Sequence, residues 1–273
     1  MRNILLPRVY LSDRHALAYF REASTPEFWD RQWQVGDLRT YLQARKADNL
    51  HIRAAKRYLS PGSIVLEGGC GRGQLVHALQ VNGYRAIGID FAVRTVHAIR
   101  RAMPDLDVLL GDVRNLPIAD GCLDGYVSVG VIEHFWEGYN PILDEIHRTL
   151  RPSGFLFISF PYMSPLRRWK VRLRAYPTGK RTEYATKRGI FYQFALPADQ
   201  VQRDLERVGF RLLERLSYDG IKGFKDEVAC LQPWLQPIYD GKKHRHLRPL
   251  LERLLRPFAS HCVLLVMQKA GGN

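Results

Sequence analysis

The sequence predicts an α/β protein built on a doubly wound, mostly parallel sheet of seven strands. Short apolar β-type runs alternate with helix-like segments, and the first three runs each lead into an acidic residue. Alternation at this period gives a parallel sheet with helices on both faces. The expected strands cover residues 63–67, 85–89, 106–110, 123–129, 154–160, 210–217 and 259–268, and the expected helices cover 74–82, 92–103, 141–150 and 197–208.

The first turn of this pattern is the most informative stretch of the chain. Residues 63–74 read SIVLEGGCGRGQ, so the strand ends in Glu67 and a glycine loop follows at once. Strand, acid, glycine turn and helix are typical of a nucleotide-type cofactor site at the carboxyl end of a parallel strand. A loop that binds pyrophosphate presents bare N–H groups and a helix N-terminus. Because a carboxylate at its mouth repels phosphate, the loop predicts a cofactor with an ammonium and no phosphate.

Two further acids follow at the ends of the next two expected strands. Asp90 closes IGID and Asp112 closes VLLGD, at spacings of 23 and then 22 residues. An acid in the position of Asp90 accepts from the ribose hydroxyls of a bound cofactor, and Asp112 is placed to accept from an exocyclic amine such as that of adenine. Taken singly, Asp90 also suits a helix N-cap and Asp112 a turn. Taken together, acids at the ends of three successive strands favour a cofactor site over these separate interpretations.

The segments VLEGGCGRG, IGID, GDVRNLPIADGCLDGYVSVGVIEHF and LRPSGFLFISFP resemble the successive motifs of class I S-adenosylmethionine-dependent methyltransferases. More narrowly, they are similar to the broad small-molecule ("type 11"-like) group with EH after the fourth strand. The match covers about residues 59–162 and implies a Rossmann-like methyltransferase fold with S-adenosylmethionine as cofactor. Glu67 stands where Asp is commoner and Gly68 where an apolar residue is usual, but neither departure removes a required group.

The resemblance also implies a role for each part of the site. The loop after Glu67 contacts the methionine part, Asp90 holds the ribose, Asp112 with Val113 flanks the adenine, and residues 128–130 line the floor. The predicted cofactor-binding residues are Glu67, Gly68, Gly69, Gly71, Gly73, Asp90, Phe91, Asp112, Val113, Ser128, Val129 and Gly130. No metal ligand is predicted.

His134, in the sequence IEHF, is the candidate catalytic residue. Methyl transfer from a sulfonium depends mainly on holding donor and acceptor close and collinear. A base is needed only where the acceptor must lose a proton, and Glu133 is placed to orient the imidazole. The alternative is a structural histidine tied to backbone near the cofactor. Tyr162, just past the fifth strand, is a weaker candidate to hydrogen-bond an acceptor.

The domain organisation predicted is an N-terminal helical cap at 1–58 and a methyltransferase domain at 59–273, with lid insertions at about 162–196 and 219–258. The first insertion interleaves arginines with aromatics, which suits phosphate, carboxylate or stacked bases; the alternative is a solvated loop and helix. In the second, the basic run 242–246 precedes an apolar stripe from Leu247 to Phe258. A basic amphipathic helix suits a membrane surface, so 241–258 is a candidate for peripheral membrane contact, although packing on its own protein is favoured.

The amino-acid composition limits which partners and which cellular compartment are expected. The formal net charge of +14 indicates attraction to something acidic, unless it reflects plain arginine richness. No run of eighteen apolar residues exists, so no transmembrane helix is expected. The four cysteines have no CxxC spacing, which argues against a zinc site and a disulfide framework. A reducing cytoplasm is the simplest compartment.

These observations favour an S-adenosylmethionine-dependent methyltransferase acting on a small molecule, lipid or glycan precursor, and the charge allows an acidic acceptor. The alternatives are an RNA methyltransferase, for which no RNA-binding module is visible, and a non-catalytic cofactor-binding or membrane-associated regulator. A dinucleotide oxidoreductase is disfavoured by Glu67, and because Gln74 stands where a dinucleotide loop has its last glycine. The oligomeric state stays open.

Overall fold

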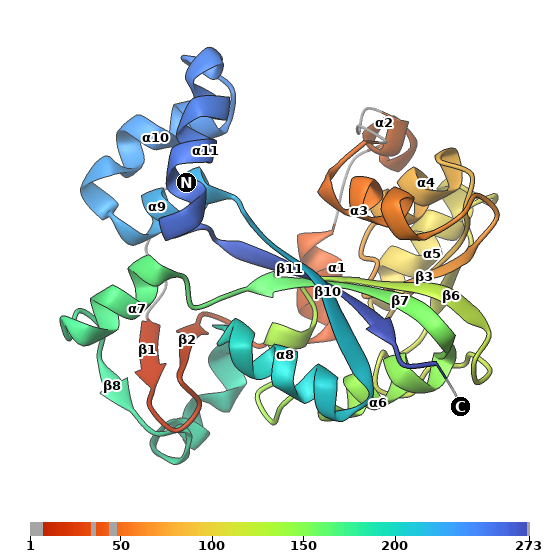
Figure 1. Cartoon of the computed structure of the whole chain (residues 1–273). Coiled ribbons are helices and arrows are strands. Elements are labelled where there is room, and N and C mark those ends of the chain that lie inside the picture. Colours follow the sequence, from red (N-terminus) through yellow and green to blue (C-terminus); the bar gives the residue numbers. More distant parts are fainter. Residues whose placement is uncertain (1–7, 34–36, 44–47, 272–273) are drawn as a thin grey trace. The chain divides into compact units, whose positions relative to one another are not determined.

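The computed structural model describes residues 8–33, 37–43 and 48–271 and contains the expected seven-stranded sheet (Figure 1). The strand order is β10-β11-β7-β6-β3-β4-β5, which confirms the predicted α/β fold class. The strands are β3 (Ile64–Gly68), β4 (Arg85–Asp90), β5 (Val108–Leu110), β6 (Leu123–Val129), β7 (Leu150–Pro161), β10 (Phe210–Tyr218) and β11 (Cys262–Lys269).

The centre of the sheet is parallel, and its register sets the site edge. Strand β3 pairs in parallel with β4 on one side and with β6 on the other, and β4 pairs in parallel with β5. Leu66 therefore lies between Ile87 and Tyr126. All but the first residue of β3 are buried, as expected for a parallel strand covered on both faces. The carboxyl ends of these four strands consequently meet at one edge.

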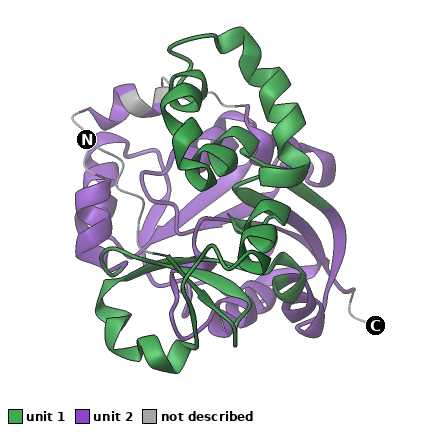
Figure 2. Ribbon diagram, turned by 90° about the vertical axis from the view of Figure 1, so that its left-hand side faces the viewer, with its two compact units in different colours: residues 1–23, 159–201, 215–264 green, residues 24–158, 202–214, 265–273 purple. Residues whose placement is uncertain are grey.

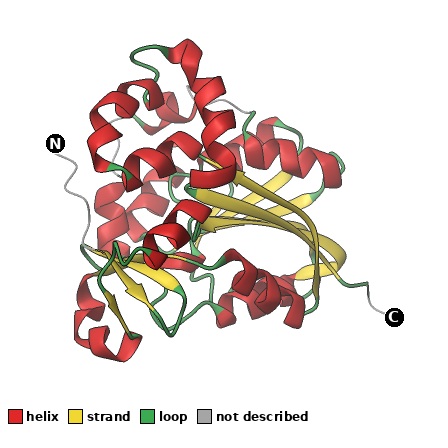
Figure 3. Ribbon diagram, turned by 60° about the vertical axis from the view of Figure 1, so that its left-hand side comes forward, coloured by secondary structure: helices red, strands yellow, loops and turns green. Residues whose placement is uncertain are grey.

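Helices cover both faces of this sheet (Figure 3). Helices α4 (Gln74–Val81) and α5 (Val93–Ala102) lie on one face, and α6 (Asn140–Thr149) lies on the other (Figure 1). Each buries an apolar stripe; in α4 it includes Leu75, Val76 and Leu79. Helix α8 (Ala198–Arg207) lies within two residues of its predicted bounds. The period of 3.6 residues was therefore a reliable guide to these helices.

The chain forms two compact units, and their boundaries differ from the predicted domains (Figure 2). Unit 1 comprises residues 1–23, 159–201 and 215–264; unit 2 comprises 24–158, 202–214 and 265–273. All twelve predicted cofactor-binding residues and His134 fall in unit 2.

The N-terminal segment, predicted as a helical cap, begins with two strands and continues with helices. Strands β1 (Arg8–Leu11) and β2 (Ala16–Phe20) form an antiparallel hairpin that joins β8 (Thr178–Gly179) and β9 (Phe191–Ala195) in a second sheet of order β8-β1-β2-β9. The pairing partners lie more than 160 residues away, so local periodicity carries no signal for them. In the described part of the predicted cap, the helices are α1 (Pro26–Gln32), α2 (Leu38–Gln43) and α3 (Leu50–Tyr58). Residues 1–7, 34–36 and 44–47 of the predicted cap lie outside the described residues.

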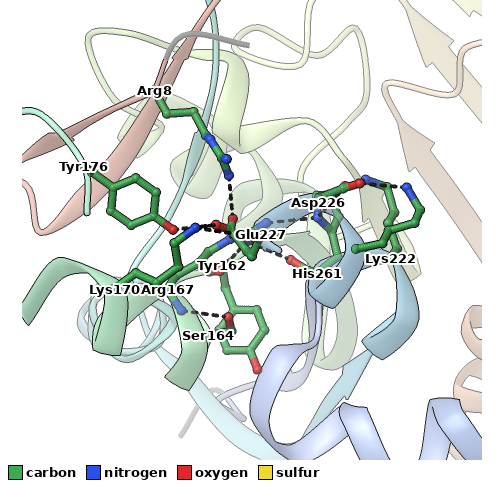
Figure 4. A network of polar contacts seen from close by, with 11 residues as sticks. Arg8, Tyr162, Ser164, Arg167, Lys170, Tyr176, Lys222, Asp226, Glu227 and His261 are labelled. Atoms are coloured by element: carbon green, nitrogen blue, oxygen red, sulfur yellow. Dashed lines mark hydrogen bonds and ion pairs between the residues drawn. The ribbon is translucent and has the colours of Figure 1, made fainter. Parts of the chain in front are cut away.

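A buried ion-pair cluster holds unit 1 together (Figure 4). Glu227, at the end of α9 (Gly220–Glu227), accepts from Arg8 (2.8 Å), Arg167 (3.0 Å), Lys170 (2.9 Å) and Tyr176 (2.5 Å). Arg167 lies in α7 (Pro165–Arg172) with a side chain 1% exposed. Burial would raise the pKa of Glu227, but the surrounding cations, Arg167 foremost, lower it to about 2. The cluster thus ties the N-terminal hairpin, α7 and α9 into one unit.

The second predicted insertion is helical. It contains α9, α10 (Gln232–Tyr239) and α11 (Arg248–Ala259). Glycines let α9 approach α11 closely: a Cβ at Gly223 would lie 1.7 Å from the carbonyl oxygen of Ala259, and one at Gly220 would lie 2.7 Å from the backbone nitrogen of Arg256. Across the described ranges, no helix combines the length and apolarity needed to cross a membrane.

Candidate active site

The glycine loop after β3 has a left-handed backbone at alternate residues. Gly69, Gly71 and Gly73 have φ of +73°, +51° and +74°, values that side-chain-bearing residues rarely adopt. A Cβ at Gly69 would also lie 2.5 Å from Val131. The loop is fastened to the end of β4, because the N–H groups of Gly69 and Cys70 both donate to the carbonyl of Ile89 (2.8 and 3.0 Å).

Two of the predicted acids bind this loop and the helix that follows it. The N–H of Val76, in the first turn of α4, donates to Glu67 Oε2 at 3.0 Å. The N–H of Gly71 donates to Asp90 Oδ2 at 2.7 Å, and that of Ala92 donates to Asp90 Oδ1 at 2.9 Å. Both carboxyl groups are buried, with 4% and 5% of each residue exposed. The acids therefore occupy N–H groups that a pyrophosphate loop leaves for its ligand.

Burial also shapes the protonation of this pair. Removal from water raises the pKa of Glu67 well above its ordinary value, and the negative charge of Asp90 adds to the effect. Burial likewise raises the pKa of Asp90, although hydrogen bonds from Ala92 and Gly71 oppose the rise. A buried carboxyl with a raised pKa gains most from a cationic partner, which favours its ionised form. The edge of the sheet is thus prepared for a positive group.

The remaining predicted residues lie at the same edge with different exposure. Asp112 follows β5 and is half-buried, and its carboxylate accepts from the backbone and guanidinium of Arg114 (2.6–3.1 Å). This hydrogen bonding lowers the pKa of Asp112. Ser128 is buried at the end of β6, and Gly130 follows with φ +71°. Of the others, Gly68 lies at the end of β3, Val113 is buried, and Phe91 and Val129 are partly buried.

A buried carboxyl oxygen at this edge has no hydrogen-bond partner among the described residues. It is Oε2 of Glu133, in the turn Ile132–His134 after β6. Burial raises the pKa of Glu133 to about 8. A Cβ at Gly130 would lie 3.5 Å from the other carboxyl oxygen, which places this acid beside the predicted site floor. An unsatisfied buried carboxyl fits a ligand that carries a cation.

The family model described as "Methyltransferase domain" matches residues 66–158, the segment that holds every one of these groups. Residues 66–158 therefore match class I S-adenosylmethionine-dependent methyltransferases. S-adenosylmethionine is the cofactor that this family implies. The residues present fit it, because the buried acids suit an ammonium and a sulfonium, and no phosphate has to be placed.

Curated relatives match the same part of the chain. A probable S-adenosylmethionine-dependent methyltransferase of Mycolicibacterium smegmatis is 34% identical over 117 residues, which are 43% of this chain and 44% of the relative. The phthiotriol/phenolphthiotriol dimycocerosates methyltransferase of Mycobacterium tuberculosis is 30% identical over 138 residues, or 47% of this chain and 49% of the relative. The chain thus matches slightly less than half the length of these relatives.

A solved structure extends the likeness to the fold. The crystal structure of a SAM dependent methyltransferase from Archaeoglobus fulgidus aligns with a TM-score of 0.55 at 16% identity, covering 89% of this chain and 99% of that one. At this identity the likeness concerns the fold. It agrees with the seven-stranded, mostly parallel sheet of the methyltransferase domain.

His134, the candidate base of the methyltransferase domain, lies in a defined polar and aromatic setting. Its Nδ1 is 3.1 Å from the hydroxyl of Ser24, and its Nε2 is 3.9 Å from Glu133 Oε1. The ring of Trp29 packs edge-on against it at 5.0 Å. The side chain is 10% exposed. The sequence associated His134 with Glu133 but gave no sign of Ser24, which comes from a segment 110 residues earlier.

The anchor of helix α1 was also missed from the sequence. Asp30 accepts from the N–H and hydroxyl of Thr95 (2.8 and 2.9 Å) and from the N–H of Arg94 (3.2 Å), so it caps the N-terminus of α5. This fixes α1, whose Trp29 stacks on Trp33, the C-cap residue of the helix, with ring centroids 5.2 Å apart. Trp33 then lies over the glycine loop, where a Cβ at Gly71 would be 3.2 Å from its ring. In the sequence, Asp30 is an isolated acid between two tryptophans, and nothing in that pattern predicts that it caps α5.

The arginine-rich lid predicted at 162–196 contributes to a pocket within unit 1. Its volume is about 340 Å³, and Arg168, Arg172 and Arg215 line it with Asp199 as the one carboxylate. Asp199 is 2.5 Å from Arg215 and 3.7 Å from Arg168. The pocket wall therefore carries a net positive charge. Tyr162 is buried at the end of β7 in the same unit, and its carbonyl accepts from Arg167.

Proposed function

We propose that this protein is an S-adenosylmethionine-dependent methyltransferase whose acceptor is a small molecule, lipid or glycan precursor. One observation carries the proposal: the carboxyl groups of Glu67 and Asp90 hold the N–H groups of Val76 and Gly71 in the glycine loop. A dinucleotide would need such groups for its pyrophosphate. A cofactor whose methionine end is positively charged needs no such N–H groups, and the buried carboxyl groups of Glu67 and Asp90 suit its charge.

In this proposal the chain mainly binds and orients. The bound cofactor supplies a methyl group already activated by the positive sulfur. Glu67 and the loop hold the methionine end, Asp90 holds the ribose, and Asp112 with Val113 flanks the adenine. His134 takes a proton from the acceptor where the acceptor must lose one, and the hydroxyl of Ser24 at 3.1 Å orients its ring.

An acidic acceptor is the finer part of the proposal. The net charge of +14 and the three arginines around the pocket in unit 1 support it. Arginine forks bind carboxylate and phosphate groups with two parallel hydrogen bonds. The relative from Mycobacterium tuberculosis is named for a lipid substrate, which supports the lipid class among the acceptors.

The test has a binding arm and a transfer arm. Calorimetry should give saturable heat with S-adenosylhomocysteine and none with NAD; the reverse result would make the site a dinucleotide site. Methyl-labelled S-adenosylmethionine is then incubated with the chain and with separate lipid, small-metabolite and RNA fractions from the producing cell. Label should enter the lipid or small-metabolite fraction. Label in RNA alone would refute the acceptor class, and binding without transfer to any fraction would indicate a regulator.

A further inference from the structure

Helix α11 carries two apolar rows, and the protein covers one of them. Leu251, Leu255 and Ala259 recur at four-residue steps and are partly or fully buried. The other row comprises Leu250, Leu254 and Phe258 of α11 and continues to Leu247, the residue just before the helix. Leu247, Leu250, Leu254 and Phe258 have exposed fractions of 37%, 55%, 64% and 43%, and we call them the outer row. Residues spaced by three and four lie on one face of a helix. A large part of the apolar stripe seen in the sequence thus faces away from the fold.

The packing of α9 explains why the outer row stays uncovered. Helix α9 meets α11 through Gly220 and Gly223, at distances that leave no room for a Cβ. Glu252 points to the same neighbour, since it accepts from the N–H groups of Gly220 (2.5 Å) and Ile221 (3.1 Å) at the start of α9. The inner side of α11 therefore packs on α9 within unit 1. The outer row is available for a partner.

The charge around the outer row is strongly positive. Residues 241–258 contain six basic side chains, namely Lys242, Lys243, Arg245, Arg248, Arg253 and Arg256, and Glu252 is their one acid. That acid accepts from N–H groups at the start of α9, and the segment keeps a net charge of +5, which is six cations less one carboxylate. The preceding helix α10 adds Trp234, a tryptophan 77% exposed. Exposed apolar side chains, tryptophan and flanking cations together are typical of helices that lie in the interface of an anionic bilayer.

We propose that the outer row of α11, with the basic side chains of residues 241–258, docks the protein on an anionic membrane surface. The apolar row enters the boundary between headgroups and acyl chains, and the cations meet the acidic headgroups. A second copy of the chain is a poorer occupant, because a two-fold contact through this face would bring the same six cations together. This proposal goes beyond methyl transfer and does not depend on it.

Co-sedimentation of the whole chain with vesicles tests the proposal. The vesicles are phosphatidylglycerol mixed with phosphatidylcholine, or phosphatidylcholine alone. We expect binding to the anionic vesicles, little binding to the neutral ones, and weaker binding as salt is raised. Leu254→Glu should lower the partition coefficient by about tenfold or more, because it places a carboxylate in the apolar row. Val81→Glu on α4 is the matched control, since Val81 is 60% exposed and lies in unit 2; it should bind like the unaltered chain.

Thermal unfolding and S-adenosylhomocysteine binding check that both variants fold. Absence of binding to anionic vesicles, or equal loss in Leu254→Glu and Val81→Glu, would overturn the proposal. So would a dimer in solution that Leu254→Glu converts to a monomer without any vesicle binding, since the outer row would then cover a second copy. If Leu254→Glu fails to fold, Arg253→Glu applies the same test through the charge beside the row, with the same expected loss.

Discussion

Glu67 is the residue on which the proposed choice of cofactor depends. Its carboxyl is buried at the end of β3 and accepts from Val76 in the first turn of α4. Glu67→Gln keeps the shape and an acceptor for Val76 but removes the charge. We expect about tenfold weaker binding of S-adenosylhomocysteine, on the scale of about 1.5–3 kcal/mol for a hydrogen bond to a charged group.

Calorimetry measures this effect, and Glu145→Gln serves as the matched control because Glu145 accepts from Leu116 on a different part of unit 2. The control should lose stability without losing affinity. Since burial raises the pKa of Glu67, a cationic ligand should release a proton on binding. The heat of binding should accordingly depend on the ionisation enthalpy of the buffer. Unchanged affinity in Glu67→Gln would show that its charge does not meet the ligand.

His134 can be tested by separating binding from turnover. The proposed base acts on the acceptor and not on the cofactor, so His134→Gln should lower kcat by about 10²-fold or more. The affinity for S-adenosylhomocysteine should change by no more than about twofold. A change in binding free energy of about 1.4 kcal/mol would already give a tenfold change. Ser24→Ala, which removes the hydroxyl 3.1 Å from Nδ1, should give a smaller loss of kcat in the same direction. A fall in cofactor affinity with unchanged kcat would assign the histidine a structural role.

At the scale of elements, the contact of α9 with α11 depends on glycine. Gly223→Ala places a methyl group 1.7 Å from the carbonyl oxygen of Ala259. Backbone cannot yield as a flexible side chain does, so we expect a loss of about 1–3 kcal/mol in the free energy of unfolding. Gly189→Ala is the control, because nothing lies within 4 Å of its Cβ position. Urea unfolding measures the free energy of unfolding of both variants. Equal values for Gly223→Ala and Gly189→Ala would show that α9 and α11 move apart at little cost.

The elements of the central sheet were predictable because their signals are local. Helices α4, α5 and α6 each start and end within one residue of the predicted bounds, and the strand ends carry the acids that the sequence pointed out. The second sheet was not predictable, since β1 pairs with β8 across more than 160 residues. The same limit applies to the site. Glu67 and Asp90 follow from spacing, whereas Ser24 and Asp30 reach the site by tertiary contacts alone.

At the scale of the whole molecule, acid should weaken unit 1 through Glu227. Its pKa falls from 4.5 to about 2 in the folded chain, because Arg167, Arg8 and Lys170 outweigh the cost of burial. A lowered carboxyl pKa stabilises the fold above the unfolded value, and this contribution is lost as pH falls from about 4.5 through about 2. The shift corresponds to about 3 kcal/mol at about 1.4 kcal/mol per pKa unit.

Glu227→Gln isolates this contribution from that of the other carboxyls. At neutral pH the variant should be about 3–5 kcal/mol less stable, because Arg167 stays buried without its charged partner. Urea is the denaturant of choice, since guanidinium would screen the charges. The difference in the free energy of unfolding between the unaltered chain and Glu227→Gln should become steadily smaller as pH is lowered toward about 2, because Glu227 itself is then protonated. A gap that does not change with pH would mean that Glu227 contributes through shape and hydrogen bonding, and that its charge does not hold the hairpin, α7 and α9 together.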